Sequence, residues 1–227
     1  MRVIPIAWTM IHAQNELFRE LGFDVNDLII EGEKDLDILG EFSGRNCYES
    51  FHKPNPSTAS NEDYLANILR TEHESVLEHS SVTFYSDGIS RNLLLELERH
   101  RHISFSVVST RYVPAEKFKS VIHPNTPDEL RDDVKWLDSK SHLLARVIYD
   151  DCIAQGMPNK KAREVARQVL PGNTETRIVV TGNLRAWRYI VKLRYTEHAD
   201  EEIRQFAGEI LRQLKQLAPN SVQDLEL

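Results

Sequence analysis

The chain has 227 residues, 41% of them hydrophobic, and a formal net charge of −7. This length and composition favour one globular domain spanning residues 1–227 with a sizeable core. The acidic balance argues against a surface built for the phosphates of long nucleic acid, so any anion site must be local.

Cysteine usage and hydropathy exclude further classes. Cys47 and Cys152 are too few and too far apart for a disulfide scaffold or a cysteine-based zinc site, which suits a reducing compartment. No run of about 18 apolar residues is present, as a membrane helix requires. The sequence therefore predicts a cytoplasmic protein that does not enter a membrane.

The first half of the chain predicts two strands and two helices. Residues 2–8 favour an edge strand, because Pro5 has no N–H to donate to a neighbour. After a Pro/Asn/Ser loop at 53–62, apolar spacing predicts a helix. Residues 80–88 predict a strand that stops at Asp87-Gly88. A helix is then expected from the four-residue spacing of Ile89, Leu93 and Leu97.

The second half is mostly helical. Residues 126–155 predict one or two amphipathic helices, and 159–170 predict another that ends at Pro171-Gly172. Residues 176–181 predict a short strand, and 198–217 a core helix. This alternation favours an α+β fold, with a small mixed or antiparallel sheet flanked by helices.

Residues 184–195 predict a helix with Asn183 as its N-cap. Its apolar stripe contains Trp187, Ile190, Val191 and Arg194, and a different face contains Arg185, Arg188 and Lys192. Burying an unpaired guanidinium costs several kcal/mol, so Arg194 needs a ligand or a carboxylate beside it. Glu96 and Glu98 are the candidate partners.

Residues 99–112, RHRHISFSVVSTRY, combine arginines with histidines and hydroxyl side chains. Arginine stays charged and donates hydrogen bonds in pairs to phosphate or to ring carbonyls, and serine and threonine both donate and accept. An anionic ligand would therefore suit this cluster. A solvated basic turn at a helix end explains the spacing equally well.

A second polar cluster lies at residues 71–79, TEHESVLEH. It is not a zincin motif, because Leu77 stands where HExxH requires histidine. A metal site formed by His73, Glu74 and His79 is one interpretation. Structural hydrogen bonding or ligand contact is the more common use of such groups.

The segment Arg99-His100-Arg101, followed after seven residues by Ser109, has the pattern RHRx7S. In its order and spacing with other segments, the chain resembles the flavin-dependent thymidylate synthases. The resembling segments cover most of the chain: EFSGRNCYES, HESVLEH, RHRHISFSVVSTRY, AREVARQVLP, NLRAWRYIVKLR and HADEEIR.

This resemblance implies a homotetrameric α+β enzyme whose active sites form between subunits. It implies FAD and NADPH as cofactors and methylation of dUMP to dTMP with the carbon of methylenetetrahydrofolate. In such chemistry the cofactor performs the redox step, and the protein contributes binding, orientation and fixed charge. No enzyme nucleophile is implied, so Ser109 is expected to contact the substrate only.

The resemblance also assigns residues. The positions that match flavin contacts are Ser75, Arg99, His100, Arg101, Val107, Asn183, Leu184, Arg185 and Tyr189. The positions that match dUMP contacts are Glu96, Leu97, Glu98, Arg99, Val107, Val108, Ser109, Thr110, Arg111, Arg167 and Arg194. Arg194 matches the catalytic residue that favours ionisation of the uracil ring at N3, and no metal is implied.

Two positions depart from the family pattern. Val107 stands where Glu or Gln is often found, and Tyr189 stands where histidine is frequent. Valine cannot make the hydrogen bonds of a polar side chain, whereas tyrosine can stack on a flavin ring.

Two other hypotheses explain the polar clusters: a non-catalytic nucleotide- or RNA-binding protein that uses the arginines, and a metal hydrolase at residues 73–79.

Overall fold

The computed structural model describes residues 1–30, 32–53 and 55–227, so residue 54 of the predicted loop lies outside the described residues. The strands are β1 (Arg2–Trp8), β2 (Ser81–Ser90), β3 (Ile103–Val107) and β4 (Glu175–Asn183). The helices are α1 (Glu16–Glu20), α2 (Val25–Ile30), α3 (Asp35–Cys47), α4 (Asn61–Arg70), α5 (Arg91–Leu97), α6 (Arg131–Ala154), α7 (Asn159–Ala166), α8 (Leu184–Arg194) and α9 (Glu201–Leu217). The site also uses two 3-10 turns, η2 (Glu74–Glu78) and η5 (Arg167–Val169).

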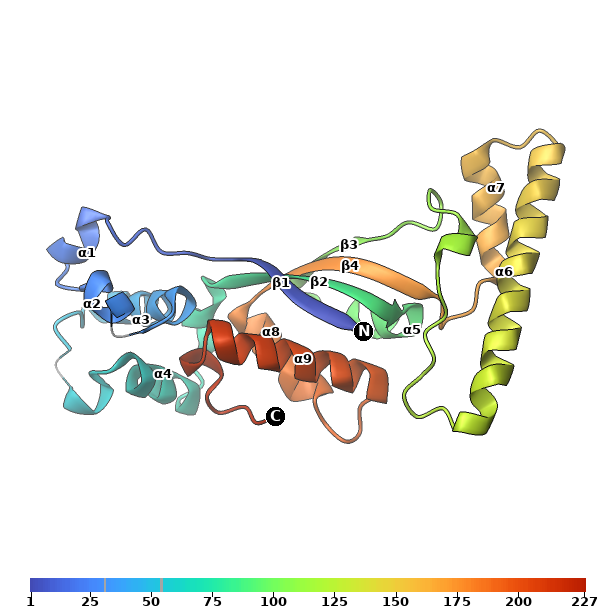
Figure 1. Cartoon of the computed structure of the whole chain (residues 1–227). Coiled ribbons are helices and arrows are strands. Elements are labelled where there is room, and N and C mark those ends of the chain that lie inside the picture. Colours follow the sequence, from blue (N-terminus) through green and yellow to red (C-terminus); the bar gives the residue numbers. More distant parts are fainter. Residues whose placement is uncertain (31, 54) are drawn as a thin grey trace.

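The strands form one antiparallel sheet in the order β1-β2-β4-β3, and the predicted α+β class is confirmed. β1 lies at an edge, as the proline in residues 2–8 predicted, and its register shifts between Pro5 and Ala7. Helices α8 and α9 lie below the sheet (Figure 1). No helix covers its upper face in the described part of the chain (Figure 1).

The main core lies between the covered face of the sheet and the helices. Alternate residues of β2 and β4 point into it, among them Val82, Phe84, Ile178 and Val180. The indole ring of Trp187 on α8 packs edge-on against Phe84 at 5.1 Å between ring centroids. This packing fixes α8 beneath the strands, and it therefore fixes the side chains at the end of that helix.

The two ends of the molecule lie beyond the sheet (Figure 1). At one end, α1 to α4 contain a second, smaller apolar cluster of Phe23, Val25, Leu28, Ile38 and Phe51. At the other end, α6 and α7 pack together as an arm (Figure 1). The sequence allowed one or two helices over residues 126–155. The structure has one, because α6 runs without a break from Arg131 to Ala154.

The strand predicted to stop at Asp87-Gly88 instead continues to Ser90. Gly88 adopts a positive φ of 66°, where the register with β4 shifts, and a Cβ there would approach the backbone of Met1 to 3.1 Å. The helix consequently begins at Arg91. Ser90 caps it, since the Ser90 Oγ accepts a hydrogen bond from the backbone N–H of Leu93 at 3.0 Å.

None of the helices formed by the described residues combines the length and the apolar composition that a membrane crossing requires.

Candidate active site

Arg194 lies at the last residue of α8 and is mostly buried, with 16% of its side chain exposed. Its Nη1 donates to Glu96 Oε2 at 2.9 Å, and its Nη2 donates to the Glu96 carbonyl at 3.3 Å. The prediction that Glu96 could pair with Arg194 is therefore confirmed. Glu98, the other candidate, is exposed to solvent.

The local sequence explains this placement. Asn183 caps α8, because its side-chain oxygen accepts a hydrogen bond from the N–H of Ala186 at 2.8 Å, as predicted. Trp187 and Ile190 are buried in the main core, and Arg194 follows four residues after Ile190 on the same stripe. Arg194 is thus directed toward the end of α5, where Glu96 lies.

His100 is buried and completes the contacts of Arg194. The Arg194 Nε donates to His100 Nε2 at 3.1 Å. Since arginine only donates, Nε2 must accept, so the proton of the neutral imidazole lies on Nδ1. Burial, with the positive charges of Arg194 and Arg99, lowers the pKa of His100 below its ordinary value. His100 is accordingly neutral at pH 7.

An accessible surface adjoins this cluster. Tyr189 is 59% exposed, and its ring meets His100 edge-on, with 6.0 Å between the ring centroids. Arg99 and Arg101 are exposed, and among the described residues neither has an ion-pair partner. These free guanidinium groups and the open aromatic face can receive an anionic, ring-containing molecule.

A second group of predicted residues lies where η2 meets the start of α8. Ser75 is exposed on η2, and Arg185 forms an ion pair with Glu78 of the same turn. Leu184 has a fully buried side chain, and its N–H donates to the carbonyl of Ser80 at 2.8 Å. Leu184 therefore holds the chain in place with both its side chain and its N–H.

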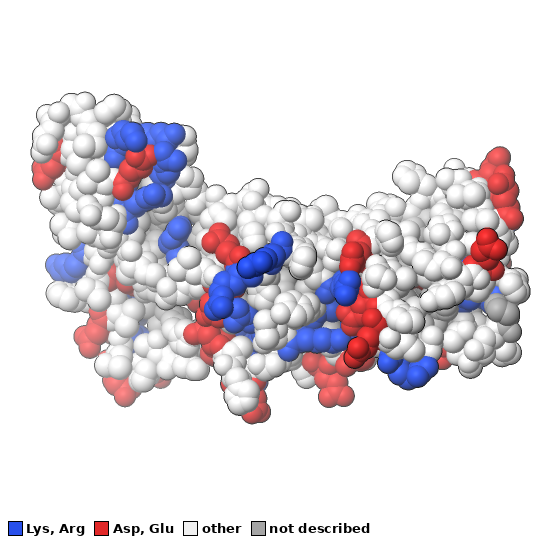
Figure 2. Space-filling model, turned by 180° about the vertical axis from the view of Figure 1, so that it is seen from behind, with Lys and Arg blue, Asp and Glu red and all other residues white. Residues whose placement is uncertain are grey.

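A third group lies where the segment after β3 meets the arm. Arg167, at the start of η5, donates to the hydroxyl of Thr110 at 3.4 Å. Arg111 pairs with Glu164 of α7, and Lys161 donates to the other oxygen of the same carboxylate at 3.0 Å. The Ser109 hydroxyl accepts from the N–H of Arg111 at 3.2 Å. Figure 2 shows basic side chains gathered with an acidic one over this arm.

A cavity of about 250 Å³ opens between α6, α7 and the segment that follows β3. Its lining includes Thr110 and Arg167, which were predicted, and Arg146, Tyr149 and Arg163, which were not. Arg163 lies over the ring of Tyr149, at 5.5 Å from the ring centroid. The four-residue spacing of Arg163 and Arg167 could have indicated that both arginines line one site.

Two predicted positions have side chains in or against the core, and a third is fixed through its backbone. Leu97 is fully buried, so only its backbone can contact a ligand. Val107 packs against the main core from β3, so its side chain makes apolar contacts there. The N–H of Val108 donates to the carbonyl of Arg177 at 3.0 Å.

Arg188 lies outside the apolar stripe of α8, as predicted, and shares its carboxylate partners with Lys192, but it is not open to solvent. Arg188 has no exposed side-chain surface, because η2 and the C-terminal segment cover it with the carboxylates of Glu74 and Asp224. Glu74 also binds Lys192, at 3.0 Å. The described residues contain no group of three or more His, Cys, Asp or Glu side chains that could bind a metal ion.

The site residues are thus divided between two parts of one chain. One group consists of Glu96 on α5, His100 just after it and Arg194 on α8. The other consists of Thr110, which follows β3, and Arg167, which begins η5 next to the arm. The five-residue strand β3 runs between them and spans about 16 Å at about 3.3 Å per residue. Among the described residues, no hydrogen bond or ion pair joins the two groups.

An antiparallel α+β scaffold presents exposed and partly buried arginines that suit an anionic ligand, and the sequence has no glycine-rich dinucleotide motif. Residues 29–220 match the family model described as thymidylate synthase complementing protein, and the chain belongs to this family.

Relatives specify the family further. The chain is 50% identical over 223 residues to a probable flavin-dependent thymidylate synthase of Mycobacterium phage L5. The aligned region covers 91% of this chain and 90% of the relative. It is 48% identical over 200 residues to the flavin-dependent thymidylate synthase of Mycobacterium tuberculosis strain H37Rv, covering 83% of this chain and 79% of the relative. The predicted membership of the flavin-dependent thymidylate synthases is confirmed.

Proposed function

We propose that this chain, as one domain of residues 1–227, is a flavin-dependent thymidylate synthase of the cytoplasm. It methylates dUMP to dTMP with the carbon of methylenetetrahydrofolate, and NADPH reduces its FAD. The relatives' names support this activity. The observation that carries it is Arg194, a largely buried guanidinium held by Glu96 and a neutral His100.

The residues around His100 suit FAD. Arg99 and Arg101 provide guanidinium groups for its diphosphate, and Tyr189 offers an open aromatic face to its ring system. Ser75 and Arg185 extend the same surface from η2 and α8. When bound, the reduced flavin supplies the hydride for the methylation.

Arg194 acts on the uracil ring of dUMP. Its guanidinium is mostly buried, and a positive charge in such surroundings stabilises a developing negative charge more strongly than it would in solvent. Because both Glu96 and His100 orient the guanidinium, it needs little reorganisation to stabilise negative charge at N3 of the ring. Ser109, Thr110, Arg111 and Arg167 hold the substrate's phosphate from the arm.

These two groups come from different subunits of a homotetramer. Their separation within one chain supports this arrangement, as does an exposed apolar stripe on α6. The stripe consists of Trp136, Leu137, Leu143, Leu144 and Val147, each 47% to 61% exposed. Apolar patches of this kind mark protein interfaces. The uncovered face of the sheet offers a second contact surface (Figure 1).

Two measurements test the activity. The purified protein is expected to be yellow, or to bind added FAD with the change in absorbance that flavin binding produces. It is also expected to release tritium from 5-tritiated dUMP when given NADPH and methylenetetrahydrofolate. A colourless protein that fails both tests would contradict the proposal.

Mixing two inactive variants tests the shared site. Arg194→Ala and Arg167→Ala each remove one half of the site, so each variant alone is expected to be inactive. Refolding the two together should restore part of the activity, since some sites then receive an intact Arg194 from one subunit and an intact Arg167 from another. No recovery in mixed oligomers would show that both residues act within one chain.

A further inference from the structure

Arg188 is the centre of a buried ion cluster. Its Nη1 donates to Asp224 Oδ1 at 2.7 Å and to the carbonyl of Ser221 at 2.6 Å. Its Nη2 donates to Asp224 Oδ2 at 2.8 Å and to Glu74 Oε1 at 3.1 Å. A guanidinium this deeply buried is tolerated only when such partners surround it.

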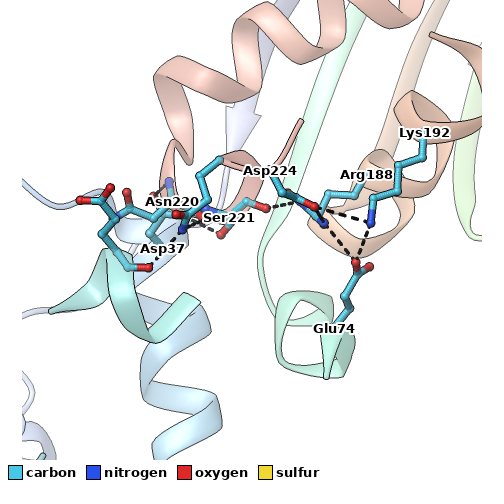
Figure 3. A network of polar contacts seen from close by, with 9 residues as sticks. Asp37, Glu74, Arg188, Lys192, Asn220, Ser221 and Asp224 are labelled. Atoms are coloured by element: carbon cyan, nitrogen blue, oxygen red, sulfur yellow. Dashed lines mark hydrogen bonds and ion pairs between the residues drawn. The ribbon is translucent and has the colours of Figure 1, made fainter. Parts of the chain in front are cut away.

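The partners of Arg188 come from segments far apart in the sequence. Figure 3 shows Glu74 reaching up from η2 and Asp224 approaching from the C-terminal segment, with Lys192 beside them. Lys192 donates to Glu74 at 3.0 Å and lies 3.8 Å from Asp224. The cluster therefore balances two cations with two carboxylates, and it ties η2, α8 and the C-terminal segment together.

Both tied segments carry residues of the flavin surface. Ser75 follows Glu74 directly on η2, and Tyr189 follows Arg188 directly on α8. Ser75 and Tyr189 are exposed, whereas Arg188 has no exposed side-chain surface. The ion cluster thus holds the backbone from the inner side while the neighbouring side chains face outward.

The C-terminal segment has a second attachment. The Asp37 carboxylate on α3 accepts hydrogen bonds from the N–H groups of Asn220 at 3.0 Å and Ser221 at 2.9 Å (Figure 3). Residues 220 and 221 are therefore held on one side, and Asp224 is held by Arg188 on the other. The family match ends at residue 220, so Asp224 lies outside the matched region.

We propose that Arg188 and Asp224 are positioning residues for the flavin: their ion pair, together with Glu74, fixes the turn that carries Ser75 against α8. This inference rests on the proposed function, because it assumes that FAD binds at Ser75 and Tyr189. The last residues of the chain thereby contribute to a cofactor site that they do not touch.

The experiment compares FAD dissociation constants by flavin fluorescence, well below the melting temperature of each variant. Asp224→Asn keeps the side-chain shape but removes the charge. We expect its Kd for FAD to rise at least about tenfold, the scale of one displaced charge-assisted hydrogen bond. Asp224→Glu restores the carboxylate, and we expect it to bind FAD nearly as tightly as the unmodified protein.

Glu209→Gln is the matched control, because it breaks an Arg–Glu pair on α9, away from the cluster, and should leave Kd unchanged. If Asp224→Asn does not fold, Glu74→Gln breaks the same cluster from the other side and should weaken FAD binding similarly. If Asp224→Asn or Glu74→Gln melts at a lower temperature but binds FAD with unchanged affinity, this inference alone is overturned. Failure of the unmodified protein to bind FAD would overturn the proposed function.

Discussion

Asp37 makes the stability of this protein depend on pH in an unusual direction. Its carboxylate is fully buried on α3 and accepts hydrogen bonds from the N–H and hydroxyl of Ser221, at 2.9 and 2.5 Å, and from the N–H of Asn220, at 3.0 Å. Burial raises the pKa of Asp37 to about 6, although the hydrogen bonds from Ser221 and Asn220 oppose this. The side chain is therefore ionised in the folded protein at pH 7, against the effect of burial.

The sign and size of the effect follow from this pKa. The folded value lies above the ordinary 3.8, so the contribution of Asp37 to stability is complete below about pH 4 and is lost as pH rises through about 6. A shift of this size corresponds to about 3 kcal/mol at pH 7. Asp37→Asn cannot ionise, but its amide N–H faces the N–H of Asn220, which costs about 1–3 kcal/mol.

We therefore expect Asp37→Asn to be less stable than the unmodified protein near pH 4.5 by about 1–3 kcal/mol, and the deficit to disappear or reverse by pH 7. Urea unfolding at one protein concentration, extrapolated linearly at several pH values, measures the difference. Asp133→Asn, at an exposed position on α6, is the control and should show no such trend. A difference that grows with pH in favour of Asp37 would refute the reasoning.

Four further predictions concern the active site. Arg194→Ala should retain FAD but lose at least about 100-fold in turnover by tritium release, and full activity would disprove its role. Arg99→Ala should raise the FAD dissociation constant by about 10–100-fold in a fluorescence titration, because an exposed unpaired guanidinium is removed. Replacing both Cys47 and Cys152 by alanine should leave methyl transfer intact, whereas loss of activity without unfolding would indicate a thiol mechanism. Burial lowers the pKa of His100, so the contribution of His100 to stability is present above about pH 6.5 and is lost as pH falls. The melting temperature of His100→Gln should therefore depend less on pH in this range than that of the unmodified protein.

Features set by neighbouring residues could be predicted from the sequence. Asn183 caps α8 because a side-chain oxygen at that position reaches the N–H of Ala186, whatever surrounds the helix. The edge position of β1 follows from Pro5 in the same way. The inward direction of Arg194 follows from its spacing with Ile190. Each of these rules acts within a few residues, so one sequence suffices to apply it.

Features set by distant segments could not be predicted. The four-residue spacing that included Ile89 indicated a helix from that residue, but pairing with Thr176 keeps Ile89 in β2. The helical spacing placed Arg188 outside the apolar stripe, but its burial depends on Asp224, 36 residues later, and on Glu74, 114 residues earlier. Periodicity describes one helix and contains no information about the segments that cover it.

Arg188 and Arg194 on α8 show how one helix serves both structure and chemistry. Arg188 is balanced by Glu74 and Asp224 and has no exposed side-chain surface, so its charge is used within the fold. Among the described residues, Arg194 has one carboxylate partner, Glu96, which is 33% exposed, and its other side-chain partner, His100, is neutral. The charge of Arg194 is therefore only partly compensated beside an open surface. An anionic ring bound there gains from this charge, whereas the same ring could not approach Arg188 without unfolding the C-terminal segment.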